Sequence, residues 1–350
     1  MTTDSHHRGA LRDVALLAAA VPFAWAAYSR LAIDHDAPLP EALPGRRRVH
    51  DAPTAGRLAY YEDDGPVPGG SAPPLLLLHS INAAASSYEM RPLWDHYRGR
   101  RRVLALDLPG YGFSERSGRR YEPDLYAAAI VEFLEGVVGA AQGADVVALS
   151  LSCEFAALAA LRRPELFHRL VMISPTGFND PPNALQQARA TGRSERIAGV
   201  LRSPPLAQPL FDLLVSRPSI GYFLRMQTEG PTDPGLEEYA WRTAHQPGAR
   251  HAPLTFLSGG LFTPDIRRAY ERLALPVLVL FDRSVNTAYE ALPDTVARHD
   301  NWRAVRIGPA RDLVHFDRPE TTTRAMDEFF AEEMLPVVLG EEEVKEAEVW

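Results

Sequence analysis

Short aliphatic runs alternate with helix-forming stretches along most of the chain. Leu75–Leu78, Val103–Leu108, Leu170–Ser174 and Val277–Phe281 are apolar segments of strand length. Uninterrupted runs of this kind are typical of strands buried on both faces of a sheet. Between them, helical spacing of apolar residues, as at 123–138, predicts helices that pack on that sheet. The pattern therefore predicts an α/β protein with a mostly parallel sheet and helices on both faces.

Residues 176–273 break this rhythm with many prolines, short helical patches and scattered aromatic residues. A segment of this length is too long for an ordinary loop, so it predicts an inserted helical lid. Residues 47–53 and 56–64 predict the two strands of a hairpin ahead of the core. The predicted organisation is an N-terminal apolar helix and linker at 1–45, a core at 46–175 and 274–335, the lid at 176–273 and an acidic tail at 336–350.

Residues 14–28 form an apolar run of 15, preceded by Arg8 and Arg12. A spanning helix needs about 20 apolar residues. Three interpretations remain: a membrane-associated segment, a cleaved signal peptide, and a helix packed on the protein itself. Pro22 and Trp25 argue against the signal peptide. We favour peripheral membrane contact through residues 14–28 and a cytoplasmic or membrane-associated location over secretion.

The overall charge narrows the classes of partner. A formal net charge of -8 and a pI near 5.8 argue against a nucleic-acid binder, which needs clustered positive charge. The single cysteine, Cys153, excludes an intramolecular disulfide and a thiolate metal cluster. The histidines lack ligand spacing, so we expect no metal and no cofactor. A small apolar molecule is the partner that we expect.

Residues 145–157 combine an apolar run, a tight turn carrying Ser152 and a helix-forming stretch. This arrangement is typical of a nucleophile elbow, in which a serine sits on a sharp strand-to-helix turn. Small residues are needed two positions on either side. Ser150 meets this need, whereas Glu154 departs from the usual GxSxG pattern. A plain strand, turn and helix without chemistry is the alternative.

Three further segments follow in a characteristic order: HSIN at 79–82, DLPGYGFS at 107–114 and VHFDRPE at 314–320. With these segments and the elbow, the chain resembles the α/β-hydrolase superfamily over residues 45–335. The resemblance implies an eight-stranded sheet with a lid between strands six and seven. By resemblance, Ser152 is the nucleophile and His315 is the general base that takes its proton. A loop histidine that caps the last helix is the alternative for His315.

The resemblance also implies an oxyanion hole made of backbone amides. The amide after the nucleophile is that of Cys153, and the other is that of Ser80 or Ile81. Asn82 could add a donor, although stabilising its own turn is the favoured role.

The acid of the triad is where the chain departs most from its relatives. Relatives usually carry it just after the seventh strand in patterns such as GDxD, and the corresponding segment here is FDRSVN. Ser284 occupies the expected position, so we choose the nearest acid, Asp282. Asp180, after the sixth strand, is the rival, and a purely structural Asp282 is a further alternative.

These assignments predict a serine hydrolase that cleaves an ester or related acyl bond of a mainly apolar small molecule through an acyl-enzyme. The alternative is a catalytically impaired hydrolase-fold protein that serves as a binder or scaffold. Because an unpaired buried carboxylate is costly, we also predict that Glu154 is paired with an arginine or bonded to backbone.

Overall fold

The computed structural model describes residues 24–65 and 72–332. The predicted acidic tail at 336–350 lies outside them. The described residues form one sheet of eight strands, which are β1 (Arg46–Ala52), β2 (Gly56–Asp63), β3 (Leu75–Leu78), β4 (Val103–Leu106), β5 (Ala144–Leu149), β6 (Phe167–Ile173), β7 (Val277–Phe281) and β8 (Trp302–Arg306).

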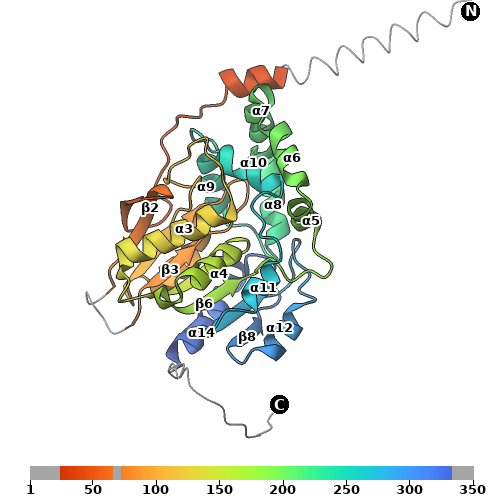
Figure 1. Ribbon diagram of the computed structural model, residues 1–350. Coiled ribbons are helices and arrows are strands. Elements are labelled where there is room, and N and C mark those ends of the chain that lie inside the picture. The colour runs from red at the N-terminus through yellow and green to blue at the C-terminus, as the bar shows by residue number, and fades with distance from the viewer. Residues whose placement is uncertain (1–23, 66–71, 333–350) are drawn as a thin grey trace, which may run out of the picture.

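The strand order is β1-β2-β4-β3-β5-β6-β7-β8, and Figure 1 shows the resulting twisted sheet. β2 pairs antiparallel with β1 and with β4, while all the other pairs are parallel. The predicted hairpin, the mostly parallel sheet and the eight strands are therefore confirmed. The carboxyl ends of the parallel strands lie at one edge, where open α/β sheets bind their ligands.

The sheet is covered on both faces, and the aliphatic runs explain why. Side chains alternate between faces along a strand. In β3, Leu76 and Leu78 belong to one apolar cluster, while Leu75 and Leu77 belong to the other. All four side chains are fully buried. A strand without polar alternation can be stable only between two helical layers.

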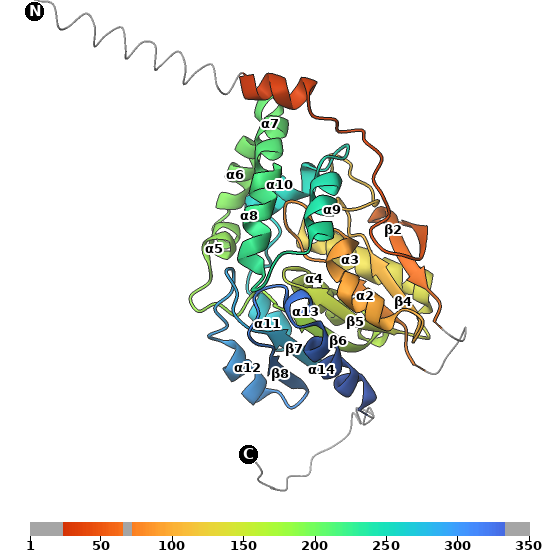
Figure 2. The same ribbon diagram turned by 180° about the vertical axis from the view of Figure 1, so that it is seen from behind.

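The first layer holds α3 (Pro123–Phe133), α4 (Ser152–Arg162), α11 (Ile266–Tyr270) and α12 (Leu292–Arg298), seen in Figure 1. The second holds α2 (Arg91–Tyr97), α13 (Val314–Asp317) and α14 (Pro319–Ala331), seen in Figure 2. Short one-turn elements or helix extensions are η1 (Ser87–Met90), η2 (Leu134–Gly139) and η3 (Pro164–Leu166).

Between β6 and β7 the chain forms a helical insertion that lies over one edge of the sheet (Figures 1 and 2). Its helices are α5 (Ala184–Ala190), α6 (Arg193–Leu201), α7 (Pro204–Leu214), α8 (Arg217–Gln227), α9 (Pro234–Ala244) and α10 (His251–Leu257). This segment is the one from which a lid was predicted.

Residues 24–31 are helical and lie against α7 at the top of the molecule (Figure 1). The Trp25 indole donates to the carbonyl oxygen of Pro209 at 2.6 Å, and the Ser29 hydroxyl donates to the Asp212 carboxylate at 2.5 Å. The end of the apolar run is thus packed on the protein, whereas residues 14–23 lie outside the described part. No helix within the described ranges is long and apolar enough to cross a membrane.

Candidate active site

The elbow turn is centred on Ser150. β5 ends at Leu149, α4 begins at Ser152, and Ser150 between them has a φ of 56°. Residues other than glycine seldom adopt this left-handed region, because it strains the backbone. A residue stays in this conformation where the surrounding structure holds it there. Here the Ser150 amide donates to the carbonyl oxygen of Ile173 at 2.8 Å. The turn presents partly exposed Ser150 to a cavity at the edge of the sheet.

Ser152, which was predicted to be the nucleophile, lies two positions beyond this strained residue. Ser152 is fully buried in the first turn of α4, and its hydroxyl donates to the carbonyl oxygen of His79 at 2.5 Å. It does not line the cavity. The sequence did carry a signal for Ser150, because Ala148 and Ser152 are the small residues two positions on either side of it.

Two of the three predicted oxyanion-hole amides are already bonded. The Ser80 amide donates to Oε2 of Glu89 at 2.8 Å, and the Cys153 amide donates to the Ser150 carbonyl oxygen at 3.1 Å. Ile81 remains a candidate, since within the described part of the chain its amide has no acceptor. The same holds for Leu151, the residue after Ser150. Ile81 and Leu151 both line the cavity.

His315 does not line the cavity that Ser150 borders. It is fully buried in α13, and its Nε2 lies 2.6 Å from the carbonyl oxygen of Glu89. Because a carbonyl only accepts, Nε2 carries the proton. Burial lowers the pKa of His315 to about 4, and Nδ1 has no protein partner among the described residues. These contacts give no support to the prediction that His315 is the base.

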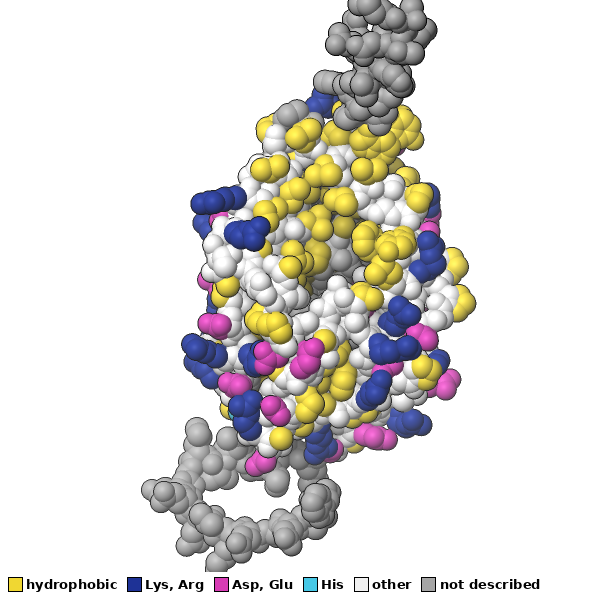
Figure 3. Space-filling model, turned by 90° about the vertical axis from the view of Figure 1, so that its right-hand side faces the viewer, with side chains coloured by type: hydrophobic (Ala, Val, Ile, Leu, Met, Phe, Trp, Pro, Cys, Tyr) yellow, Lys and Arg dark blue, Asp and Glu magenta, His cyan; other side chains and the backbone are white. Residues whose placement is uncertain are grey.

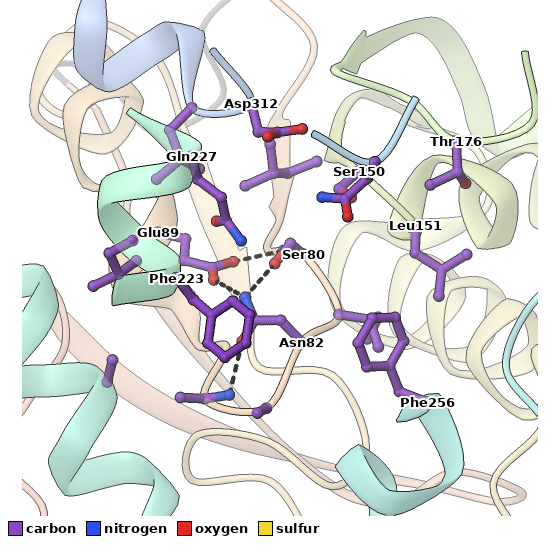
Figure 4. A pocket seen from close by; sticks show the side chains of 18 of the residues that line it. Ser80, Asn82, Glu89, Ser150, Leu151, Thr176, Phe223, Gln227, Phe256 and Asp312 are labelled. Carbon is purple, nitrogen blue, oxygen red and sulfur yellow. Dashed lines mark hydrogen bonds between the residues drawn. The ribbon is translucent and has the colours of Figure 1, made fainter. Parts of the chain in front are cut away.

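Asp312 occupies the loop after the last strand, where a general base was expected, and its carboxylate borders the cavity with Ser150 (Figure 4). It accepts hydrogen bonds from the Ser284 hydroxyl and, at 3.3 Å, from the Val285 amide. Its carbonyl oxygen accepts from the Ser174 hydroxyl at 2.7 Å. Burial raises the pKa of the Asp312 carboxyl above its ordinary value. Sequence reasoning missed this residue because a histidine stands three positions away.

Asp282 and Asp180, the two acids predicted from the sequence, contact arginines rather than Asp312. The Asp282 carboxylate accepts from Nε of Arg306 at 2.6 Å and from the Ala310 amide at 2.8 Å, so it holds the turn after β8. Burial opposes ionisation of Asp282, but these hydrogen bonds outweigh it and lower its pKa. Asp180 is exposed, 3.6 Å from Arg267. Neither acid lines the cavity, and Ser284, at the expected acid position, is the residue that contacts Asp312.

The cavity has a volume of about 300 Å³, with a polar base and apolar walls. Figure 3 shows the opening among hydrophobic side chains, and Figure 4 shows Phe223 and Phe256 facing it. Its lining side chains from the helical insertion are mostly apolar: Leu185, Leu214, Ile220, Phe223, Leu224, Leu236, Ala240, Phe256, Leu257 and Phe262. No histidine of the described residues lines it.

Half-buried Asn82 and buried Glu89 form a polar cluster at the base of the cavity (Figure 4). Nδ2 of Asn82 donates to the Ser80 hydroxyl at 2.9 Å and to Glu89 at 2.7 Å, while its Oδ1 accepts from the Ala84 amide. Asn82 thus stabilises its own turn, as favoured from the sequence. The cluster fixes the loop that carries Ile81.

Glu154 lies behind this site rather than in it. It is fully buried, and it accepts from the Thr176 hydroxyl at 2.6 Å and from the Thr263 amide at 2.7 Å. The predicted backbone hydrogen bond is confirmed. Burial raises the pKa of Glu154 to about 7.

The structure also offers no cluster of three or more His, Cys, Asp or Glu suited to a metal ion within residues 24–65 and 72–332.

A strained serine between a parallel strand and a helix, beneath an inserted set of helices, defines the α/β-hydrolase class. The chain belongs to the alpha/beta hydrolase family, whose model matches residues 75–325. The particular relatives are distant. A 2-hydroxymuconate semialdehyde hydrolase of Pseudomonas sp. (strain CF600) is 29% identical over 114 residues, which are 32% of this chain and only 40% of that protein.

A 2-(acetamidomethylene)succinate hydrolase of Mesorhizobium japonicum is 26% identical over 272 residues, covering 74% of this chain and 88% of that protein. Among solved structures, a serine hydrolase involved in carbazole degradation superposes with a TM-score of 0.64 at 16% identity. That match covers 81% of this chain and 98% of the other. This similarity extends over the whole fold. The residue that acts as general base has to be inferred from the geometry of this chain.

Proposed function

We propose that the protein is a hydrolase that cleaves an ester or related acyl bond of a mainly apolar small molecule, with Ser150 as nucleophile. The observation that carries this proposal is the left-handed conformation of Ser150 at the base of an apolar cavity. Local strain of this kind costs about 1–3 kcal/mol, which suits a residue whose position serves chemistry. The distant relatives named as hydrolases support the reaction class.

In this proposal Asp312 takes the place of the histidine base. The Ser150 hydroxyl attacks the substrate carbonyl carbon while its proton passes to the Asp312 carboxylate. The amides of Ile81 and Leu151 donate to the oxyanion. The leaving group then takes the proton from Asp312 and departs. Water attacks the acyl-enzyme and gives a proton to Asp312, which passes it to the Ser150 oxygen as the C–O bond to the serine breaks and the acid is released.

Two features favour Asp312 as a proton acceptor. Burial raises its pKa, and a carboxylate with a raised pKa is a stronger base than an ordinary one. The Ser284 hydroxyl and the Val285 amide hold the carboxylate in one orientation. Since the base must be ionised, kcat/KM is expected to rise with pH through that raised pKa and then level off.

The substrate class rests on the cavity. About 300 Å³ lies at the small end of ligand pockets, and leucine and phenylalanine side chains supply most of its walls. A compact acyl group or a short chain suits this space. A panel of p-nitrophenyl esters of graded chain length measures the preference directly.

A second candidate function is ligand binding without turnover. It is favoured by the absence of a histidine among the described residues that line the cavity, and by the unusual acid at the base position. With no imidazole in the lining, no imidazolium can form for a carboxylate to stabilise, so the familiar triad chemistry has no direct counterpart here.

A fluorophosphonate probe separates the two functions. The hydrolase proposal expects covalent labelling of the wild-type chain, retained in Ser152→Ala and lost in Ser150→Ala. Asp312→Asn should slow labelling strongly while leaving the protein folded. A folded wild-type sample that neither reacts with the probe nor hydrolyses any ester favours the binder.

We also propose that residues 14–28 make a peripheral membrane contact. Support comes from apolar side chains exposed on the neighbouring surface: Tyr28, Leu31, Leu206, Leu213, Tyr222 and Phe223. Phe223 also lines the cavity, so this surface adjoins its opening. An apolar substrate dissolved in a bilayer would then enter without crossing water.

A further inference from the structure

A second cavity, of about 280 Å³, lies between the helical insertion and the loop at 118–122. It is separate in its lining from the cavity at Ser150 and is predominantly polar. The side chains that border it come from that loop, from α5 and α6, and from the region around α10. They include four arginines, two glutamates and several hydroxyls: Arg119, Arg120, Arg189, Arg202, Glu122, Glu195, Ser194, Thr255, Ser258 and Tyr121.

Two buried donors in this cavity have no protein partner. The Ser194 side chain is 1% exposed, and its hydroxyl makes no hydrogen bond in the described part of the chain. Nε of Arg189 is also buried and without an acceptor there. Within the same ranges, the Arg189 side chain forms no ion pair and no hydrogen bond. A buried polar group left unpaired costs about 1–3 kcal/mol, so both donors call for an acceptor.

The charges around the cavity leave an excess of donors. Both glutamates form ion pairs with the same arginine, since Arg120 lies 3.3 Å from Glu122 and 3.4 Å from Glu195. Arg202 donates to the Thr255 hydroxyl. Arg119 donates to the carbonyl oxygens of Ala55 and Thr54 at 2.8 and 2.6 Å, so it pairs with neither glutamate of the cavity. With four arginines against two glutamates, the lining carries a net positive charge.

The helix α6 adds to this field. Its nine residues begin at Arg193, directly after Gly192 with a φ of 70°, and no side chain caps it. Ser194 lies in its first turn, where free backbone amides and the helix dipole attract an anion. Serine hydroxyls, arginine guanidinium groups and a helix start together match the acceptor oxygens of a phosphate group.

We propose that this second cavity binds a phosphate group, either as inorganic phosphate or as part of a small phosphate monoester. Arg189 and Ser194 donate to its oxygens, and Arg202 contributes charge. The bound anion would contact α5 and α6 on one side and the loop at 118–122 on the other. It would thus bridge the helical insertion and the core, and stabilise their contact. The proposal does not depend on the reaction proposed for Ser150.

Calorimetric titration of the full-length protein tests this inference, at constant ionic strength, with inorganic phosphate and with glycerol 3-phosphate as separate ligands. We expect saturable binding of one anion per chain and a melting temperature that rises with ligand. Losing a charge-assisted hydrogen bond should raise Kd about tenfold or more in Arg189→Gln. Ser194→Ala should weaken binding without changing the net charge. Tighter binding of glycerol 3-phosphate would identify a monoester rather than the free ion as the better ligand.

Arg196→Gln is the matched control, because Arg196 is an exposed arginine of the same helix outside the cavity lining. It removes the same charge and should leave Kd unchanged. Circular dichroism verifies that each variant is folded. Absence of saturable binding of both ligands, or equal weakening by Arg189→Gln and Arg196→Gln, would overturn the inference.

Discussion

Ser150 and Ser152 are two serines of one turn with opposite surroundings. Ser150 faces the cavity, whereas the Ser152 hydroxyl donates a hydrogen bond to the buried carbonyl oxygen of His79. Ser152→Ala should therefore lower the free energy of unfolding by about 1–3 kcal/mol, because it leaves that oxygen without a donor. Denaturant titration measures the loss, and ester hydrolysis should stay near the wild-type rate. Loss of hydrolysis in a folded Ser152→Ala protein would restore Ser152 as the nucleophile.

Asp282 and Asp312 provide a second contrast between neighbouring acids. Asp312→Asn should lower kcat by at least about a hundredfold, since an amide cannot take the serine proton. Asp282→Asn should weaken the contacts with Arg306 and Ala310, and so reduce stability more than kcat. Rate measurements combined with thermal melts of both variants resolve the two roles. The reverse pattern would make Asp282 the catalytic acid, as the sequence suggested.

Glu154 should make stability depend on pH. Its pKa of about 7 in the folded protein lies above its ordinary value of 4.5, so the folded state holds the proton more tightly. Stability that is present below the ordinary pKa is then lost as pH rises through about 7, at up to ~1.4 kcal/mol per pH unit. Unfolding of wild type and Glu154→Gln between pH 4 and 8 measures this.

The Gln variant reproduces the protonated acid: its oxygen can accept from the Thr263 amide while its NH2 donates to Thr176. The stability of Glu154→Gln relative to wild type should therefore increase with pH. A difference that stays constant over this range would show that folding does not raise the pKa of Glu154.

At the scale of elements, the strands were the most predictable part. β3 and β7 have the predicted bounds, because a run of four or five apolar residues matches the length of a strand that is buried on both faces. The helices were predicted with less accurate ends. The predicted helix at 123–138 is α3 followed by the wider turns of η2, and the sequence carries no clear mark of that change.

The site was predicted to within a few residues but not in its chemistry. Both ALSLS and SLSCE place a serine between a strand and a helix, and only the sign of φ at residue 150 decides between them. That angle depends on the hydrogen bond from Ser150 to Ile173 and on where α4 begins. Similarly, Asp312 and His315 stand three residues apart, and the fold of their loop determines which one faces the cavity.

The helix at 24–31 allows the role of the N-terminus to be divided between two deletions. Removing residues 1–23 should reduce co-sedimentation with phosphatidylcholine vesicles and leave the melting temperature unchanged. Removing residues 1–35 also takes away Ser29 and His35, both partners of buried Asp212. Losing hydrogen bonds to a buried carboxylate should cost about 3 kcal/mol, so that protein should melt earlier. Equal vesicle binding by all three proteins would contradict the membrane proposal.

At the scale of the whole molecule, the opening of the cavity lies among hydrophobic side chains (Figure 3). Phe223 is 50% exposed and also lines the cavity, so it contacts both solvent and any bound substrate. Phe223→Ala should raise KM about tenfold for p-nitrophenyl esters with longer acyl chains, and less for the acetate, since apolar burial scales with area. Tyr222→Ala is the control, because Tyr222 is exposed but does not line the cavity.

The only sulfhydryl of the chain, on Cys153, lies one residue beyond the first position of α4. It is fully buried, its sulfur contacts the carbonyl oxygen of Ala148 at 3.2 Å, and burial raises its pKa well above the ordinary value. A thiol in this state reacts with a reagent such as dithionitrobenzoate only after the surrounding structure opens. The rate at which this reagent colours the unmodified protein therefore measures how often the turn between β5 and α4 opens.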